Sequence, residues 1–270
     1  MDAPDALARL PAGLRPVVAT YLGAVHAALT GDVRAVIVTG SAAQDDWCPG
    51  RSDLDVVVVT GAAGAGPHLA ALTSTHRRVA AEQAVGIDAV YMPAAVLGQR
   101  PLRGAPARAV KINGVDDPLP SIPDPVLWAM IHRHGVAVRG PAPATICPEP
   151  EASWLREWNS TNLHQYWRPW AERARRHLRS LDRAAVQPAE GVAWGLLGPG
   201  RLHCTIQTGA VISKTAAADY TGGRFPAWAG LLERAKRWRA GDDGQAFSAA
   251  DGLATCALID AIVQDIGPEP

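Results

Sequence analysis

Three short apolar runs stand out in the first third of the chain. Residues 35–38, 56–59 and 86–92 are rich in β-branched and aromatic side chains, and each run is bounded by Gly, Pro, Asp or Ser. Short runs of this kind are typical of buried strands. The pattern therefore predicts three strands of a sheet in the N-terminal part of the chain.

Apolar residues at helical spacing flank these runs. Residues 4–30 predict one or two helices with a break near Pro11 and Pro16, and residues 68–85 predict another helix. Residues 93–125 are rich in Pro, Gly and Arg and have no clear period, so we expect a long connection there.

The pattern changes near residue 150. A helix ending at Gly135 and a short strand lead into a Pro-rich stretch at 140–150, which has the composition of a linker. From Glu151 onward, long helical patterns dominate, at residues 152–184, 192–208, from 213 onward, 227–239 and 246–265. A chain of 270 residues is long enough for two domains. We therefore expect domains at 1–150 and 151–270.

Composition excludes several classes of function. Acidic and basic residues are balanced at 26 each, which gives no bias toward nucleic acid or an anionic membrane surface. No apolar stretch approaches the roughly 18 residues of a membrane span, and no signal-peptide pattern is present. The four cysteines are scattered and form no zinc or disulfide pattern. We expect a soluble cytoplasmic protein, a monomer or weak dimer, with no membrane association and no stable nucleic-acid partner.

Carboxylates gather at the start of the second and third predicted strands. Asp53 and Asp55 are two residues apart, so in an extended segment they project to the same side, roughly 6.5 Å apart. A hard cation such as Mg²⁺ favours such an oxygen cluster. Asp88 interrupts the third apolar run, and a buried carboxylate is costly unless it is paired or binds a metal. We expect Asp88 to be a third carboxylate of this site, and the alternative is an aspartate at a strand end whose hydrogen bonds are satisfied locally.

Gly40 and Ser41 follow the first predicted strand and lead into a short helix. Backbone N–H groups at such a position can bind an anion. A phosphate site and a metal site a dozen residues apart suggest a nucleoside triphosphate bound with its metal. The alternative is an ordinary turn followed by a polar strand entry, because short motifs have many chance matches.

The order Gly-Ser, short helix, Asp-x-Asp resembles the nucleotidyltransferase superfamily. Nearly the whole chain resembles the aminoglycoside adenylyltransferases of the streptomycin/spectinomycin type, through three stretches: TGSAAQDDWCPGRSDLDVVVV, HGVAVRGPAPA and GRLHCTIQTGAVISKTAAADY. The resemblance implies an α+β fold, in which a nucleotidyltransferase (polymerase-beta-like) domain with a mixed sheet and helices precedes an α-helical bundle that binds the acceptor. It also implies an active site in the cleft between the two domains.

The resemblance also implies roles for individual residues. Asp53 and Asp55 match metal ligands, and Asp88 matches the catalytic base and third metal ligand. The implied nucleotide-binding residues are Gly40, Ser41, Ser52, Arg201, Lys214 and Trp238. The chain departs from the best-known members, which have glutamate at the base position and tyrosine at the adenine-stacking position. The acidic residues that hold streptomycin also have no match in GVAWGLLGPG, residues 191–200.

The residues and the resemblance together predict a Mg²⁺-dependent enzyme that transfers AMP from ATP to a hydroxyl of an aminoglycoside or aminocyclitol. Its substrate would be small, hydroxylated and cationic. The resemblance suggests a part in antibiotic resistance, and a metabolic role remains open. Three alternatives remain open: nucleotidylation of a protein or tRNA, modification of a metabolite that is not an antibiotic, and a catalytically silent nucleotide-binding module.

Overall fold

The computed structural model describes residues 3–29, 31–62, 65–101, 107–113 and 116–269. The chain divides into two compact units, Met1–Pro150 and Glu151–Pro270, and each is described by itself. Across the described residues, no helix is both long and apolar enough to cross a bilayer.

Unit 1 contains a six-stranded mixed sheet with the strand order β5-β4-β3-β2-β1-β6. Strands β2 and β3 are parallel, and the other neighbours are antiparallel. The bounds are β1 Val33–Val38, β2 Leu54–Thr60, β3 Ile87–Pro93, β4 Ala109–Ile112, β5 Leu119–Ser121 and β6 Val136–Arg139. This sheet and the helical second unit confirm the predicted α+β class.

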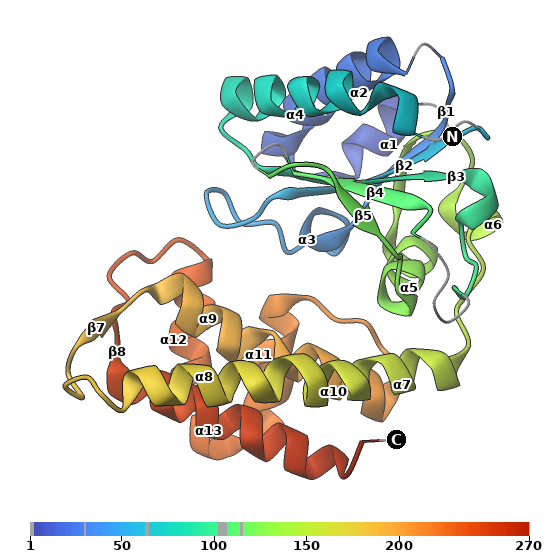
Figure 1. Ribbon diagram of the computed structural model, residues 1–270. Helices are drawn as coiled ribbons and strands as arrows, with labels where there is room; N and C mark the ends of the chain where they lie inside the picture. The colour runs from blue at the N-terminus through green and yellow to red at the C-terminus, as the bar shows by residue number, and fades with distance from the viewer. Residues whose placement is uncertain (1–2, 30, 63–64, 102–106, 114–115, 270) are drawn as a thin grey trace. The chain divides into compact units, whose positions relative to one another are not determined.

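Helices α2 (Arg15–Ala28) and α4 (Leu69–Gln83) pack together on one face of the sheet (Figure 1). Alternate strand residues point to opposite faces, and those pointing toward α2 and α4 form the apolar core shared with these helices. The members of this core that come from β1, β2 and β3 are Val33, Val36, Val38, Leu54, Val56, Val58, Ile87, Ala89 and Tyr91. The remaining helices of the unit are α1 Ala3–Ala8, α3 Gly40–Ala43, α5 Pro125–His134 and α6 Pro143–Ile146.

The opposite face of the sheet carries the charged residues. Asp55 and Asp88 alternate with core residues on β2 and β3, so their side chains leave the face away from α2 and α4. Helices α3 and α5 lie on this second side of the sheet (Figure 1). Other residues of these strands on the second face, such as Ile37, Val57 and Met92, are apolar and buried, so Asp55 and Asp88 are polar positions on a face that is otherwise largely apolar.

The prediction of one long connection at residues 93–125 is wrong. This segment contains β4 and β5, which extend the sheet beyond β3. The two strands are only 4 and 3 residues long, too short for a period to show in the sequence. Pro120 also interrupts the pattern, and an edge strand such as β5 tolerates it because one side of an edge strand has no hydrogen-bonded neighbour.

A buried polar cluster connects α2, α4 and β3. The hydroxyls of Tyr21 and Tyr91 are 2.7 Å apart, and Nε2 of His76 is 2.8 Å from the Tyr91 hydroxyl. All three side chains are almost completely buried. Burial disfavours the imidazolium and lowers the pKa of His76 from 6.5 to about 4.

We expect unit 1 to lose stability on mild acidification. The pKa of His76 is lower in the folded state than in the unfolded state, so the unfolded state binds more protons between pH 6.5 and 4. The contribution of His76 to the free energy of unfolding is fully present above pH 6.5. It is smaller by about 2 kcal/mol at pH 5 and by about 3 kcal/mol at pH 4. Urea unfolding at pH 7.5 and pH 5 would measure it. In a His76→Gln variant this part of the pH dependence should disappear. If the unfolding free energy fell equally with pH in both proteins, His76 would not be its cause.

Unit 2 contains one long, continuous helical segment. Helix α7 (Ala152–Asn162) continues through a π-helical turn, Leu163–Trp167, into α8 (Arg168–Leu178). Helix α13 (Ala249–Ile266) packs along α8, as Figure 1 shows. The other elements are α9 Ala189–Leu197, α10 Pro199–Thr208, α11 Lys214–Arg224, α12 Ala229–Arg239 and the short strands β7 Val186–Gln187 and β8 Phe247–Ser248.

Two local features of unit 2 bear on the sequence predictions. The single helix predicted at 192–208 is two helices, because Pro199 lacks the N–H that would continue the hydrogen-bond ladder. The predicted helix start near Ser213 is confirmed, since the Ser213 side chain accepts a hydrogen bond from the backbone N–H of Ala216.

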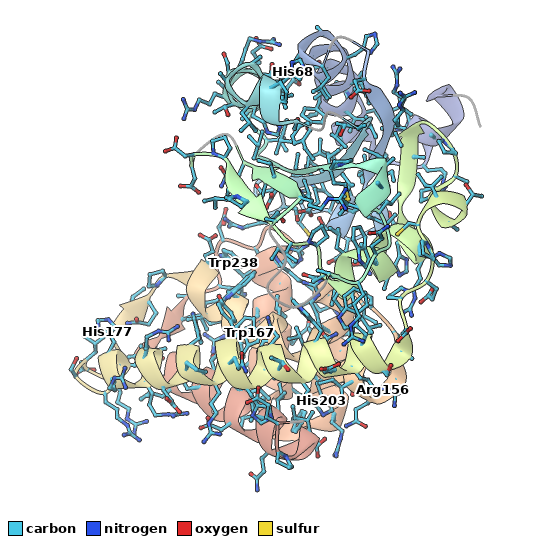
Figure 2. All side chains as sticks on the ribbon, turned by 45° about the vertical axis from the view of Figure 1, so that its right-hand side comes forward. His68, Arg156, Trp167, His177, His203 and Trp238 are labelled. Carbon is cyan, nitrogen blue, oxygen red and sulfur yellow. The ribbon has the colours of Figure 1, made fainter. Side chains whose placement is uncertain are left out.

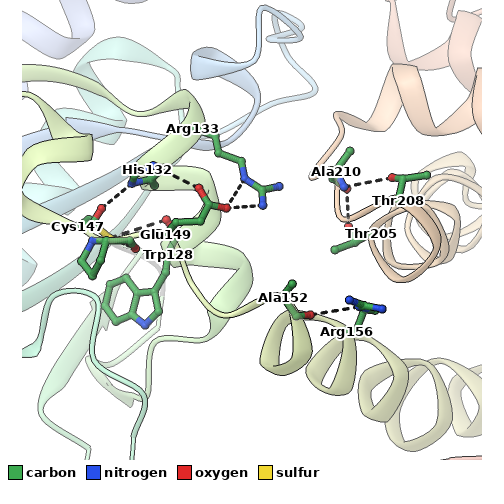
Figure 3. Close-up of polar contacts among 11 residues, drawn as sticks. Trp128, His132, Arg133, Cys147, Glu149, Ala152, Arg156, Thr205, Thr208 and Ala210 are labelled. Carbon is green, nitrogen blue, oxygen red and sulfur yellow. Dashed lines mark hydrogen bonds and ion pairs between the residues drawn. The ribbon is translucent and has the colours of Figure 1, made fainter.

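The end of unit 1 is tied to α5 by charged contacts (Figure 3). Nε of Arg133 donates to Glu149 at 2.7 Å, and Nε2 of His132 lies 3.3 Å from the same carboxylate. Nδ1 of His132 donates to the carbonyl of Cys147 at 2.8 Å. Together these contacts hold the last residues of unit 1 against its core.

Candidate active site

Asp55 lies against the turn that leaves β1. The Asp55 carbonyl accepts a hydrogen bond from the N–H of Thr39 at 2.9 Å, and Gly40 then begins the short helix α3 with φ +60°. A Cβ added to Gly40 would lie 1.9 Å from Oδ2 of Asp55. The glycine of the Gly-Ser pair is therefore needed both for its backbone conformation and for the close approach of this carboxylate.

Asp53 makes a similar approach to a second glycine. The N–H of Leu54 donates to the carbonyl of Gly86 at 2.8 Å, which brings the start of β2 against the start of β3. A Cβ added to Gly86 would lie 2.2 Å from Oδ1 of Asp53. Each of the two carboxylates thus packs against a backbone position that lacks a side chain.

Parallel pairing of β2 and β3 places Asp55 directly beside Asp88. Neighbouring strands are about 4.8 Å apart, and paired residues point to the same face. Nζ of Lys111, on β4, lies 2.7 Å from Oδ2 of Asp88. The structure therefore brings Asp55 and Asp88 together on one face, with Lys111, which the sequence did not suggest, beside Asp88.

The residues present fit a nucleotide-bound Mg²⁺. Among the described residues, no three His, Cys, Asp or Glu side chains come close enough to form a metal site by themselves. Mg²⁺ in such sites is commonly held by one or two carboxylates, with phosphate oxygens and waters completing its shell. The oxygen donors of Asp53 and Asp55 are of the type that this requires.

Ser52 organises the connection between α3 and β2. Its Oγ accepts a hydrogen bond from the N–H of Cys48, and its carbonyl accepts one from Nε1 of Trp47, each at 3.1 Å. Ser41 lies on α3, where its carbonyl accepts from the N–H of Asp46 at 2.9 Å. The two predicted phosphate-binding serines therefore bracket one hydrogen-bonded connection.

The predicted nucleotide residues of unit 2 lie around the start of α11. Nε of Arg201 donates to the carbonyl of Ile212 at 3.1 Å, which ties α10 to the segment just before the helix. Lys214 is the first residue of α11, and its Nζ lies 5.4 Å from the ring centroid of Trp194. This is cation–π geometry.

Two tryptophans of unit 2 differ in exposure. Trp238, on α12, is half-buried and packs against the unit 2 core, and Figure 2 labels it together with Trp167. Trp194 is 42% exposed, and its ring centroid lies 5.5 Å from that of Trp167.

Sequence reasoning did not single out Trp194, although it is the one tryptophan in the segment GVAWGLLGPG. It also missed Lys111, although lysine is rare in this Arg-rich chain.

Comparison with solved structures gives a match over almost the whole chain. The crystal structure of spectinomycin adenyltransferase AAD(9) from Enterococcus faecialis, with ATP and spectinomycin, superimposes with a TM-score of 0.67. The match covers 92% of this chain and 98% of that protein, at 11% sequence identity. A comparison with models of known protein families finds no match, and neither does a comparison with the sequences of curated proteins. The chain therefore has an aminoglycoside nucleotidyltransferase-like fold, as its motifs predicted.

Gly40→Ala should disturb the candidate site specifically. The added methyl group must displace the Asp55 carboxylate, and the positive φ adds about 1–2 kcal/mol of backbone strain. Gly50→Ala is a matched control, because Gly50 has φ +69° but no atom within 4 Å of an added Cβ. We expect both variants to lose stability in thermal unfolding, Gly40→Ala at least as much as Gly50→Ala because of the added contact with Asp55, and only Gly40→Ala to lose most Mn²⁺ binding in calorimetry. Equal Mn²⁺ affinity in the two variants would contradict the close contact with Asp55.

Proposed function

We propose that the chain is a Mg²⁺-dependent nucleotidyltransferase that moves AMP from ATP to a hydroxyl group of a small aminocyclitol-like molecule. The observation that carries the proposal is the pairing of Asp55 with Asp88 on adjacent parallel strands, next to the Gly40–Ser41 turn. The shared fold with an adenyltransferase whose structure contains ATP and spectinomycin supports it.

In the proposed reaction, the acceptor oxygen forms a bond to the α-phosphorus while the bond to the β-phosphate breaks and pyrophosphate leaves. Bound Mg²⁺ would supply charge neutralisation on the triphosphate. Asp53 and Asp55 would hold the metal, and Asp88 would accept the proton of the acceptor hydroxyl. The triphosphate contacts Ser41 and Ser52.

Residues of unit 2 would complete nucleotide binding. Lys214 and Arg201 supply positive charge for the phosphates, of which Lys214 offers the compact ammonium that can follow charge developing on pyrophosphate. The nucleobase would stack on tryptophan. Trp238 is the residue that the family resemblance suggests, and the exposed ring of Trp194 beside Lys214 is the other candidate.

A transfer assay with ATP labelled at the α-phosphate tests the proposal. The acceptors would be spectinomycin, streptomycin, a protein mixture and tRNA, each with and without Mg²⁺. We expect labelled spectinomycin, with a lower kcat/KM for streptomycin because its guanidinium groups need carboxylates that segment 191–200 lacks. Label on protein or tRNA alone would favour those alternatives. Absence of both transfer and ATP binding would contradict the proposed enzyme.

A further inference from the structure

Trp194 and Lys214 come from two helices of unit 2 that pack against each other, α9 and α11. Nζ of Lys214 lies 5.4 Å from the centroid of the Trp194 ring. An ammonium group within about 6 Å of a tryptophan ring is attracted by the negative charge density on the ring face. The ring is 42% exposed, so this contact is not enclosed by the core of unit 2.

The ring of Trp194 rests on a packed neighbour. Its centroid lies 5.5 Å from that of Trp167, a buried side chain of the π-helical turn that Figure 2 labels. A Cβ added to Gly198 would lie 2.3 Å from Cζ2 of Trp167, so the glycine allows Trp167 to approach α9 closely. The segment in which the sequence offers no carboxylate for streptomycin therefore carries a firmly supported aromatic ring.

The backbone that carries Lys214 is fixed on both sides of the lysine. The Ser213 side chain accepts a hydrogen bond from the N–H of Ala216 at 3.2 Å, and Nε of Arg201 donates to the carbonyl of Ile212 at 3.1 Å. The main freedom left to Lys214 is that of its long side chain, which is costly to order when a ligand binds. A ring that holds the ammonium group beforehand reduces this cost.

The start of α11 is an unfavourable place for an isolated cation. Lys214 is the first residue of this helix, where the helix dipole is positive and favours an anion. The face of Trp194 compensates by attracting the ammonium group without neutralising it. An ammonium has three donors, so contact with a ring leaves N–H groups for a phosphate.

We infer that Trp194 is a positioning residue, which holds the ammonium group of Lys214 ready for the phosphates of the nucleotide. This inference rests on the proposed function, in which Lys214 contacts the triphosphate, and it adds a residue to that site. It also assigns stacking of the nucleobase to Trp238 and not to Trp194.

Two substitutions at Trp194 and two ligands test the inference. Trp194→Leu removes the ring face, and Trp194→Phe keeps a smaller one. The ligands are ATP and tripolyphosphate, each with Mg²⁺, and tripolyphosphate has no base to stack. We expect Trp194→Leu to weaken the binding of both ligands by about 3- to 10-fold, as calorimetry or competition against ATP would measure. Trp194→Phe should stay within about 2-fold of the wild-type protein.

A double-mutant cycle with Lys214→Ala tests whether Trp194 acts through the lysine. In the Lys214→Ala background, Trp194→Leu should cause no further loss of ATP affinity, because there is no ammonium left to position. A merely structural role would weaken ATP binding equally in both backgrounds. The midpoint of thermal unfolding, measured for each variant, shows whether unit 2 remains folded.

Three outcomes would overturn the inference. They are unchanged or tighter ATP binding in Trp194→Leu, a loss of ATP affinity with unchanged tripolyphosphate affinity, and an equal effect of Trp194→Leu with and without Lys214. The second outcome would show that Trp194 stacks on the nucleobase. The proposed function fails in a different way, because a wild-type protein that bound no ATP in the presence of Mg²⁺ would contradict it whatever the variants did.

Discussion

Asp55→Asn is expected to lower AMP transfer by about 10²- to 10⁴-fold, because it removes one negative charge from the proposed metal site. Asparagine has the same shape as aspartate, so the packing of the side chain against Gly40 should survive. The midpoint of thermal unfolding should therefore change little while activity is lost. Transfer rates over a range of Mg²⁺ concentrations, together with Mn²⁺ binding by calorimetry, would measure the effect.

Two further variants make this result specific. Asp53→Asn should behave in the same way, since Asp53 immediately precedes β2 and is the other proposed metal ligand. Asp45→Asn is the control: Asp45 is an exposed carboxylate in the connection before β2, and its φ of +56° suits asparagine. The Asp45 variant should keep its Mn²⁺ affinity. Near-normal turnover of Asp55→Asn with Mg²⁺ would exclude a metal site built on Asp53 and Asp55.

The second prediction distinguishes a residue needed for the chemical step from a residue needed for nucleotide binding. Asp88→Ala should lower transfer by about 10²- to 10⁴-fold, the range typical of a positioned general base, while ATP binding persists. Lys214→Ala should weaken ATP binding as well, because its ammonium would contact phosphate before and during transfer. Calorimetry with ATP and initial rates with spectinomycin distinguish the two variants.

The contact between Asp88 and Lys111 calls for a second substitution at Asp88. Alanine removes the partner of Lys111 and leaves its ammonium beside the reaction site, which could impair ATP binding indirectly. Asp88→Asn keeps a carbonyl oxygen for Lys111 but cannot accept the hydroxyl proton efficiently. If both Asp88 variants lost ATP affinity and Lys214→Ala kept it, the assigned roles would have to be exchanged.

Local features of the candidate site could be predicted because they depend on a few neighbouring residues. The spacing of Asp53 and Asp55 puts them on one side of an extended segment whatever lies beside it. The turn at Gly40 and the cap at Ser213 similarly follow from the preferences of glycine and serine at helix starts. These positions were therefore apparent before the fold was known.

The resemblance of whole motifs predicted the α+β class, which the match in fold confirms. The limits of individual helices and strands were predicted less accurately than the fold class. The strands β4 and β5 were missed because they are short and lie toward an edge of the sheet, where burial imposes only a weak pattern. Lys111 was missed with them, since a lysine in an unrecognised strand has no predicted neighbour.

The sequence by itself determined which residue types could form the site, and the tertiary structure decided which of them meet. Asp55 and Asp88 are adjacent only because β2 and β3 pair in one register, and a shift by one residue would turn Asp88 to the opposite face. The contact of Lys111 with Asp88 likewise depends on the pairing of β3 with β4. Strand register results from the packing of the whole apolar face against α2 and α4, so it is a property of the folded unit and not of any local stretch of sequence.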